Sequence, residues 1–154
     1  MAKGKATELF TVGYEHTTPG AFQDTLTRAG VDLLVDVRAV ASSRRPGFSK
    51  GALSAGVSEL GIAYVHLRPL GTPKEGRLAA RSGDHAGLMR IYNAHLETPA
   101  AREALDELAS LTKGRRICLM CYEQHVEGCH RLRLAEILCE RLDVPVEHLM
   151  PAAF

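Results

Sequence analysis

Short apolar runs alternate along the chain with stretches in which apolar residues recur every three or four positions. The runs predict five strands, at residues 8–13, 31–37, 62–67, 115–121 and 144–149. The periodic stretches predict helices near residues 18–30, 49–61, 88–96, 98–114 and 129–142. Strands that alternate with helices are typical of parallel sheets with right-handed crossovers. We therefore predict an α/β fold in three layers, with a mostly parallel central sheet of about five strands and helices on both faces.

The first predicted helix has the clearest boundaries. Thr18 is a favourable N-cap, Pro19 suits the first helical position, and Gly30 suits the residue that ends a helix. Phe22 and Leu26 fall on one side of this helix, which we expect to pack against the sheet.

The stretch from residue 70 to residue 87 breaks the alternation. It contains five glycine or proline residues among charged ones, and it is long for a connection in a compact domain. We predict that residues 72–87 form a loop, the most mobile internal segment, which is able to close over a site.

Composition narrows the classes of function. Apolar residues make up 45% and charged residues 24%, with a formal net charge of +1, as in a soluble globular protein. We expect residues 1–154 to form a single domain, with residues 1–7 as a disordered tail. No apolar run is long enough to cross a membrane and the first residues do not resemble a secretory signal, so we expect a cytoplasmic protein without membrane contact.

Polar side chains collect where the predicted strands end. Ligands bind outside the carboxyl ends of the strands in an open parallel sheet, so this edge is the expected site. The anion-binding candidates are Tyr14, Asp36, Arg38, Arg44, His66 and Lys74, and the catalytic candidates are Cys121, Glu123, Cys129, His130 and Arg131. Together they predict a basic crevice that receives an anionic group, with a cysteine at its floor.

Cys129, His130 and Arg131 open the last predicted helix. Arg131 shares a face with Ala135 and Leu138, the face turned towards the sheet, where an apolar residue would be usual. A helix N-terminus and a nearby cation both stabilise a thiolate. We therefore predict that the pKa of the Cys129 thiol lies below its usual value of about 8.5.

The other three cysteines are less distinctive. Cys118 lies inside a predicted strand and Cys139 beside the apolar face of the last helix, so we interpret both as core residues. Cys121 is open between a core role and a role in the site. A chain of this size does not need disulfide bridges, so metal binding or thiol chemistry is the expected use of any special cysteine.

Several motifs, taken in order, resemble one family. They are Thr11-Val12-Gly13-Tyr14, Asp36-Val37-Arg38, Ser43-Arg44, Pro46-Gly47-Phe48-Ser49, Gly61 to Leu67, Leu70-Gly71, and Cys121-Tyr122-Glu123 with Cys129-His130-Arg131. From about Leu9 to about Leu149 the chain resembles the bacterial and archaeal family called domain of unknown function 488. Ala41 and Thr72 depart from the proline and glycine that the family often has there. The resemblance implies an α/β fold and a site at the Cys-His-Arg motif, and it implies no particular reaction.

The leading hypothesis is a small enzyme, a cysteine-dependent transferase or hydrolase, that binds a phosphate-bearing or other anionic substrate such as a nucleotide. Cys129 would be its nucleophile or redox thiol, with His130 as proton carrier. Arg38, Arg44 and Arg131 would hold the anion. No cofactor is predicted, and the oligomeric state is left open.

Two alternatives remain open. One is a nucleic-acid-associated binding module with structural cysteines, whose affinity should be weak and sensitive to salt because the net charge is small. Its phosphate contacts would come from Arg44, Arg45, Lys50, Lys74 and Arg77. The other is a metal site formed by Cys121, Cys129 and His130, with Asp36 or Glu123 as a fourth ligand. The spacing of the two cysteines matches no common zinc pattern, so we predict no stoichiometric metal.

Overall fold

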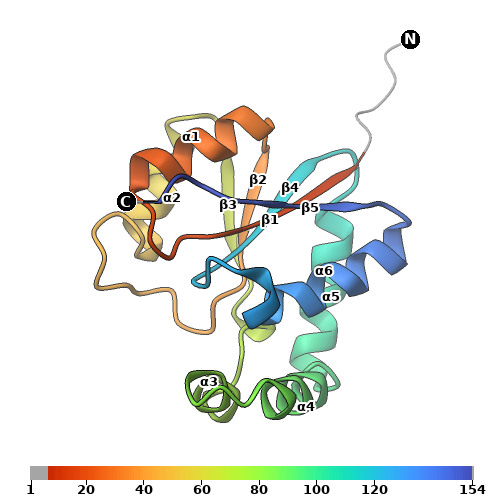
Figure 1. Cartoon of the computed structure of the whole chain (residues 1–154). Helices are drawn as coiled ribbons and strands as arrows, with labels where there is room; N and C mark the ends of the chain where they lie inside the picture. Colours follow the sequence, from red (N-terminus) through yellow and green to blue (C-terminus); the bar gives the residue numbers. More distant parts are fainter. Residues whose placement is uncertain (1–6, 154) are drawn as a thin grey trace.

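A five-stranded sheet forms the centre of the computed structural model, which describes residues 7–153 (Figure 1). The strands are β1 (Glu8–Gly13), β2 (Leu33–Asp36), β3 (Ala63–His66), β4 (Arg116–Cys121) and β5 (Val146–Leu149). They lie in the order β3-β2-β4-β1-β5, and each pair of neighbours is parallel. The α/β prediction is confirmed. Of the predicted tail, residues 1–6 lie outside the described residues, whereas the Thr7 hydroxyl donates to the carbonyl of Thr112.

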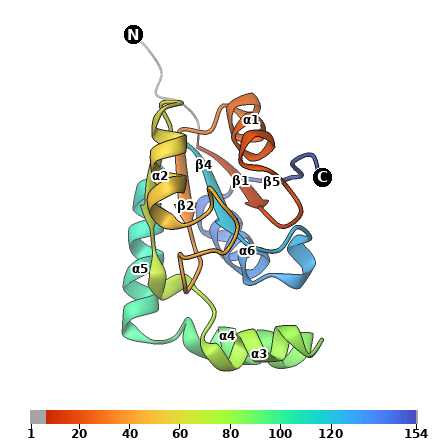
Figure 2. The ribbon, with the colours of Figure 1, turned by 90° about the vertical axis from the view of Figure 1, so that its left-hand side faces the viewer.

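Helices cover both faces of this sheet. They are α1 (Pro19–Ala29) and α2 (Lys50–Ser58) on one face, and α5 (Pro99–Leu111) and α6 (His130–Leu142) on the other (Figure 2). Successive strand residues point to opposite sides, so Leu34 and Cys118 pack with the first pair of helices, whereas Val35 and Leu119 pack with the second. The central strands β2 and β4 are therefore buried on both faces, which explains their nearly continuous apolar sequences.

The helix boundaries follow the local signals in the sequence. The Thr18 hydroxyl accepts a hydrogen bond of 3.1 Å from the N–H of Ala21, and Pro19 is the first residue of α1. Gly30 ends this helix in the left-handed conformation, with φ of 71°. A residue with a Cβ is strained there, so the glycine fixes where the helix stops.

The segment predicted to be a mobile loop is helical instead. It forms α3 (Lys74–Arg81) and the first turn of α4 (His85–His95), and these two helices pack against each other. The rest of α4 matches the helix predicted at residues 88–96. The Asp84 carboxylate caps α4 by accepting a hydrogen bond of 2.9 Å from the N–H of Gly87. Gly76 lies against Thr72, and a Cβ on that glycine would overlap the threonine methyl group. The loop prediction was wrong because glycines used for close packing hid a short helical pattern.

α3 and α4 lie beyond the carboxyl end of β3, apart from the helices that cover the sheet (Figures 1 and 2). A single 3₁₀ turn, η1 (Arg68–Leu70), leads to them. Two side chains of α4 tie the pair to this turn: the Tyr92 hydroxyl donates to the carbonyl of Leu70, and His95 Nε2 donates to that of Pro69, both over 2.6 Å. The two helices are thereby held at the edge of the sheet where the sequence predicts the site.

Candidate functional site

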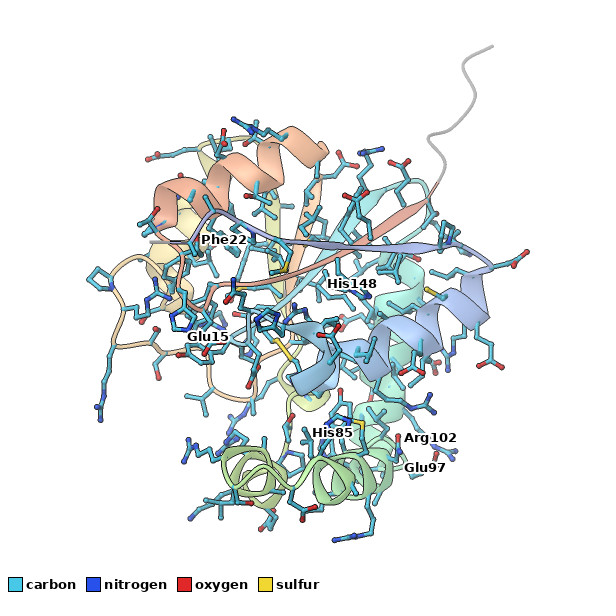
Figure 3. The ribbon with its side chains drawn as sticks, viewed as in Figure 1. Glu15, Phe22, His85, Glu97, Arg102 and His148 are labelled. Atoms are coloured by element: carbon cyan, nitrogen blue, oxygen red, sulfur yellow. A yellow bond between two sulfur atoms is a disulfide. The ribbon has the colours of Figure 1, made fainter. Side chains whose placement is uncertain are left out.

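Two of the four cysteines are joined at the carboxyl edge of the sheet. Cys121 is the last residue of β4, Cys129 is the N-cap of α6, and their sulfur atoms are bonded (Figure 3). Both residues are buried, and their Cα atoms are 7.6 Å apart. The sequence analysis did not expect a disulfide, but it selected both cysteines as candidate site residues. Cys121 belongs to the buried core and also contacts Cys129 and Arg131.

Arg131 contacts both of these cysteines and has no exposed surface. Its Nη1 donates to the sulfur of Cys121 over 2.9 Å and to the carbonyl of Glu123 over 2.6 Å, and its Nη2 donates to the carbonyl of Gln124. Burial lowers the pKa of Arg131 to about 10, which leaves the guanidinium charged at neutral pH. Within residues 7–153, no carboxylate forms an ion pair with it. A buried cation thus faces a sulfur atom rather than an acidic side chain.

The loop between β4 and α6 crosses directly over the end of β1. Gly13 is the last residue of that strand, and a Cβ on it would overlap the carbonyl of Glu123. The Glu15 carboxylate then accepts a hydrogen bond of 3.0 Å from the N–H of Gln124. Together with the bonds from Arg131, these contacts fix the path of the loop and so the position of Glu123.

His130 lies on the other side of the Cys129 sulfur, with its Nδ1 3.6 Å away. Its Nε2 donates to the carbonyl of Val37 over 2.8 Å, so in the neutral ring Nδ1 carries the lone pair. Burial lowers the pKa of His130 to about 4, and the ring is therefore neutral near pH 7. In a reduced protein, Nδ1 can accept the hydrogen of the Cys129 thiol.

Glu123 completes a group of three residues that donate electron pairs. Its Oε2 lies 3.4 Å from the sulfur of Cys121, and desolvation raises the pKa of its carboxyl group. One potential ligand atom from each of Cys121, Glu123 and Cys129 lies within 4.8 Å of the others. The group can therefore approach a single atom from three sides.

A second buried network stands next to the cysteines, at the end of β2. Asp36 and Arg38 form a bidentate ion pair, with distances of 2.8 and 2.7 Å. The Tyr64 hydroxyl donates to the same carboxylate, while Arg38 also donates to the hydroxyl of Tyr14 and His66 Nε2 donates to the carbonyl of Arg38. Burial and the Asp36 charge raise the pKa of Tyr64. The network holds the Arg38 side chain in one position with its charge balanced.

Two adjoining pockets, of about 400 and 350 Å³, open onto these groups. Cys129 lines the larger pocket, whereas Cys121 and Arg38 line the smaller. The residues that line both are Thr72, Arg77, Arg81, Tyr122, Glu123 and His130. Helix α3 therefore supplies one wall and the loop after β4 supplies the facing one.

Six of the eleven candidate residues from the sequence line these pockets, and five do not. Asp36 and Arg131 are fully buried, Arg44 and Lys74 are exposed, and His66 donates to the carbonyl of Arg38. Arg45, next to Arg44, instead packs over the rings of Tyr14 and Phe48. It also donates to the carbonyl of Thr17.

Arg81 and Tyr122 are pocket residues that the sequence analysis did not select. Arg77 and Arg81 are four residues apart and so share one face of α3, a spacing that becomes informative only once the segment is recognised as a helix. Tyr122 stands between two candidates and is 44% exposed, which is unusual for a large aromatic side chain.

The sheet and the joined cysteines define an α/β protein with two bonded cysteines at the carboxyl edge of its strands. The chain belongs to the family described as Domain of unknown function DUF488, whose model matches residues 18–138. This confirms the resemblance drawn from the sequence motifs. No curated protein and no solved structure matches the chain. Among the described residues, no helix combines the length and apolar character needed to cross a membrane.

Proposed function

We propose that the protein is a thiol–disulfide enzyme for a small anionic substrate, with Cys129 as the attacking sulfur and Cys121 as the second sulfur. The observation that carries this proposal is the bond between the two cysteines in pockets lined by three arginines. The sequence analysis expected a cysteine-dependent enzyme of unspecified reaction. The present proposal specifies a reaction in which two cysteines together transfer two electrons to the substrate. It fits a cytoplasmic protein, because the thiol pool of that compartment would regenerate the dithiol form.

The reaction starts from the reduced pair and a substrate that contains a disulfide. The Cys129 thiolate attacks one sulfur of the substrate, forming a mixed disulfide and releasing the other half as a thiolate. Cys121 then attacks the sulfur of Cys129, forming the Cys121–Cys129 bond and releasing the second half. Two electrons pass to the substrate, and the two cysteine protons end on the two released thiols.

The neighbouring side chains suit these steps. His130 Nδ1, 3.6 Å from the Cys129 sulfur, carries a lone pair that can accept a hydrogen bond from the attacking thiol. The Arg131 guanidinium, 2.9 Å from the Cys121 sulfur, stabilises that residue as a thiolate for the second attack. The backbone N–H of Arg131 also donates to the sulfur of Cys129, over 3.4 Å.

The charge in the pockets favours an anionic substrate. Arg38 is neutralised by Asp36, but no carboxylate forms an ion pair with Arg77 or Arg81 among the residues that the structure describes. Arg77 Nη1 donates to the carbonyl of Thr72, which leaves its other donors for a ligand. A phosphate or carboxylate group on the substrate would accept hydrogen bonds from both helix arginines.

The proposal can be tested with two aromatic disulfides that release a coloured product when a thiol attacks them. One is the dianionic dithiobis(nitrobenzoate), and the other is the neutral dithiodipyridine. We use the reduced, chelator-treated protein carrying Cys118→Ala and Cys139→Ser. One equivalent of either reagent per chain should release two coloured thiolates, because the second cysteine displaces the bound half, and Cys121→Ser should release only one. The double variant Arg77→Gln/Arg81→Gln should slow the anionic reagent by about tenfold or more, the lower range of electrostatic steering, and leave the neutral one unchanged.

Lys113→Gln is the matched control, because Lys113 is an exposed cation in the turn before β4, at the opposite edge of the sheet. It should alter neither rate. A single released thiolate per chain from the unsubstituted pair would overturn the proposed reaction. Equal slowing of both reagents by the double variant would overturn the role of the arginines.

A further inference from the structure

We infer that the reduced protein binds a thiophilic divalent cation, Zn²⁺, through the sulfurs of Cys121 and Cys129 and the carboxylate of Glu123. The site goes beyond the proposed function but uses the same cysteines, so the metal-bound form and the disulfide form are alternative states of one pair. Reduction of the disulfide takes two electrons from a reductant such as a phosphine. Metal binding then releases the two thiol protons to solvent.

The spacing of the three residues suits one metal ion. Ligand atoms at usual zinc distances, about 2.3 Å for sulfur and 2.1 Å for oxygen, are about 3.6 Å apart in a tetrahedral site. Cys121 Sγ and Glu123 Oε2 are 3.4 Å apart, and all three ligand atoms lie within 4.8 Å of one another. Reduction breaks the bond between the two sulfurs, after which rotation of the two cysteine side chains can open a space for an ion between them.

The charges around the site also fit a dication. Two thiolates and one carboxylate carry three negative charges, which the metal and the buried guanidinium of Arg131 would balance. Arg131 already donates to both sulfurs, from Nη1 to Cys121 and from its backbone N–H to Cys129. Such donors orient thiolate ligands and support metal affinity.

The ligand set differs from the one considered from sequence, which included His130. His130 Nε2 is used by the carbonyl of Val37, and Nδ1 faces the Cys129 sulfur from the side. Glu123 takes its place, since its fixed loop brings the carboxylate to Cys121. All three ligands line the pockets, so a fourth coordination position would face the open space, as in catalytic zinc sites with three protein ligands. This inference replaces the expectation of no stoichiometric metal, which was based on sequence spacing alone.

Cobalt is the probe, because Co²⁺ bound by thiolates has an intense charge-transfer band in the near ultraviolet. The full chain is reduced with a phosphine, which is removed before Co²⁺ is added without oxygen. One equivalent should produce the band, and Zn²⁺ should displace it. The same chain oxidised to the Cys121–Cys129 disulfide should give no band. Absence of the band in the reduced protein would overturn the inference, as would an equal band in the oxidised protein.

Glu123→Gln and Glu127→Gln form a matched pair, because Glu127 is an exposed carboxylate in the same loop. Loss of a residue that only hydrogen-bonds to a ligand costs about 10–100-fold in metal affinity. Glu123→Gln should weaken Zn²⁺ binding by more than this, and Glu127→Gln should not. Equal affinities for the two variants would exclude Glu123 as a ligand and overturn the site as drawn. Applied to the protein with both Cys121 and Cys129 intact, the thiol exchange assay distinguishes the proposed enzyme from the proposed metal site. Exchange without a cobalt band rejects the metal site alone, and a band without exchange rejects the enzyme alone while supporting the metal site.

Discussion

The guanidinium of Arg131 lies 2.9 Å from the sulfur of Cys121, although the two residues are ten positions apart in the chain. The sequence analysis paired this arginine with Cys129, two positions before it. Only the backbone N–H of Arg131 reaches Cys129, because the side chain turns back across the end of β4. The cation should therefore influence Cys121 more strongly than Cys129.

In the reduced, metal-free protein, we expect Arg131→Gln to slow alkylation of Cys121 by about tenfold, the effect of one pKa unit on the thiolate fraction. Cys129 should be slowed less, and Cys118 should react slowly throughout because burial raises the pKa of its thiol. Iodoacetamide labelling followed by peptide mass measures each rate. Arg133→Gln is the control, since Arg133 donates to Asn93 away from the site. Identical effects of the two arginine substitutions would contradict this assignment.

Gly13→Ala should destabilise the protein and disturb the site together. The added Cβ would overlap the carbonyl of Glu123, so the loop after β4 would have to move. Overpacking of this kind costs about 1–3 kcal/mol, which urea unfolding can measure. Thiol exchange should slow as well, because the moved loop carries a contact of Arg131. Gly20→Ala, where a Cβ meets nothing within 4 Å, should cost nothing. A Gly13→Ala protein with unchanged stability and full exchange activity would contradict this prediction, because it would mean that the loop after β4 does not need to pass so close to residue 13.

The pH dependence of stability should depend on His130. Its pKa is about 4 in the folded protein, against about 6.5 in an unfolded chain. Between these values the unfolded state binds more protons, so the free energy of unfolding should fall as the pH is lowered from about 6.5 to about 4. The loss should reach about 3 kcal/mol and then level off.

Urea unfolding in the presence of a chelator, repeated across this pH range, measures the effect. His130→Asn should flatten the profile, because an amide side chain does not titrate. His125→Asn should leave the profile unchanged, since His125 is exposed in the same loop. A profile in His130→Asn as steep as in the wild type would assign the acid sensitivity to other groups.

Tyr64→Phe should weaken the network that holds Arg38. The substitution removes a donor to the buried Asp36 carboxylate, and a hydrogen bond to a charged group contributes about 1.5–3 kcal/mol. Tyr122→Phe, at an exposed position, should change the unfolding free energy by less than about 0.5 kcal/mol. Equal stabilities of the two variants would mean that Arg38 alone satisfies Asp36.

The sequence predicted the strands well because each has its own apolar run, and it predicted the starts of α1 and α5 from their threonine caps. The boundaries of β2 and β3 came within two residues for this reason, and Thr18 and Gly30 defined α1 directly. α3 was missed because its eight residues include Gly76 and carry few apolar side chains. Helical periodicity is weak in so short a segment.

The site was predicted in outline but not in its pairings. Parallel strands bring their ends to one edge, so Cys121, Asp36 and Tyr14 were expected to be neighbours. The distance between Cys121 and Cys129 depends on the path of the intervening loop, which Gly13 and Arg131 determine through contacts distant in sequence. Local patterns carry no information on such contacts. The same holds for Arg81, whose place in the pocket depends on where α3 lies beyond the ends of the strands.

The strand order determines when the candidate site can form as the chain is synthesised. β4 lies between β1 and β2, so in a growing chain the first 115 residues can form only the ladder between β2 and β3. β1 must wait for both of its partners, β4 and β5, which are synthesised last. The strands that carry Asp36 and Gly13 thus gain their common neighbour, β4, only when the segment that bears both sulfurs is inserted between them. Neither cysteine can contact the Asp36 network or the end of β1 before the chain has been synthesised past residue 129. β4, the last strand to enter the centre of the sheet, carries Cys121 at its end, and Cys129 follows it.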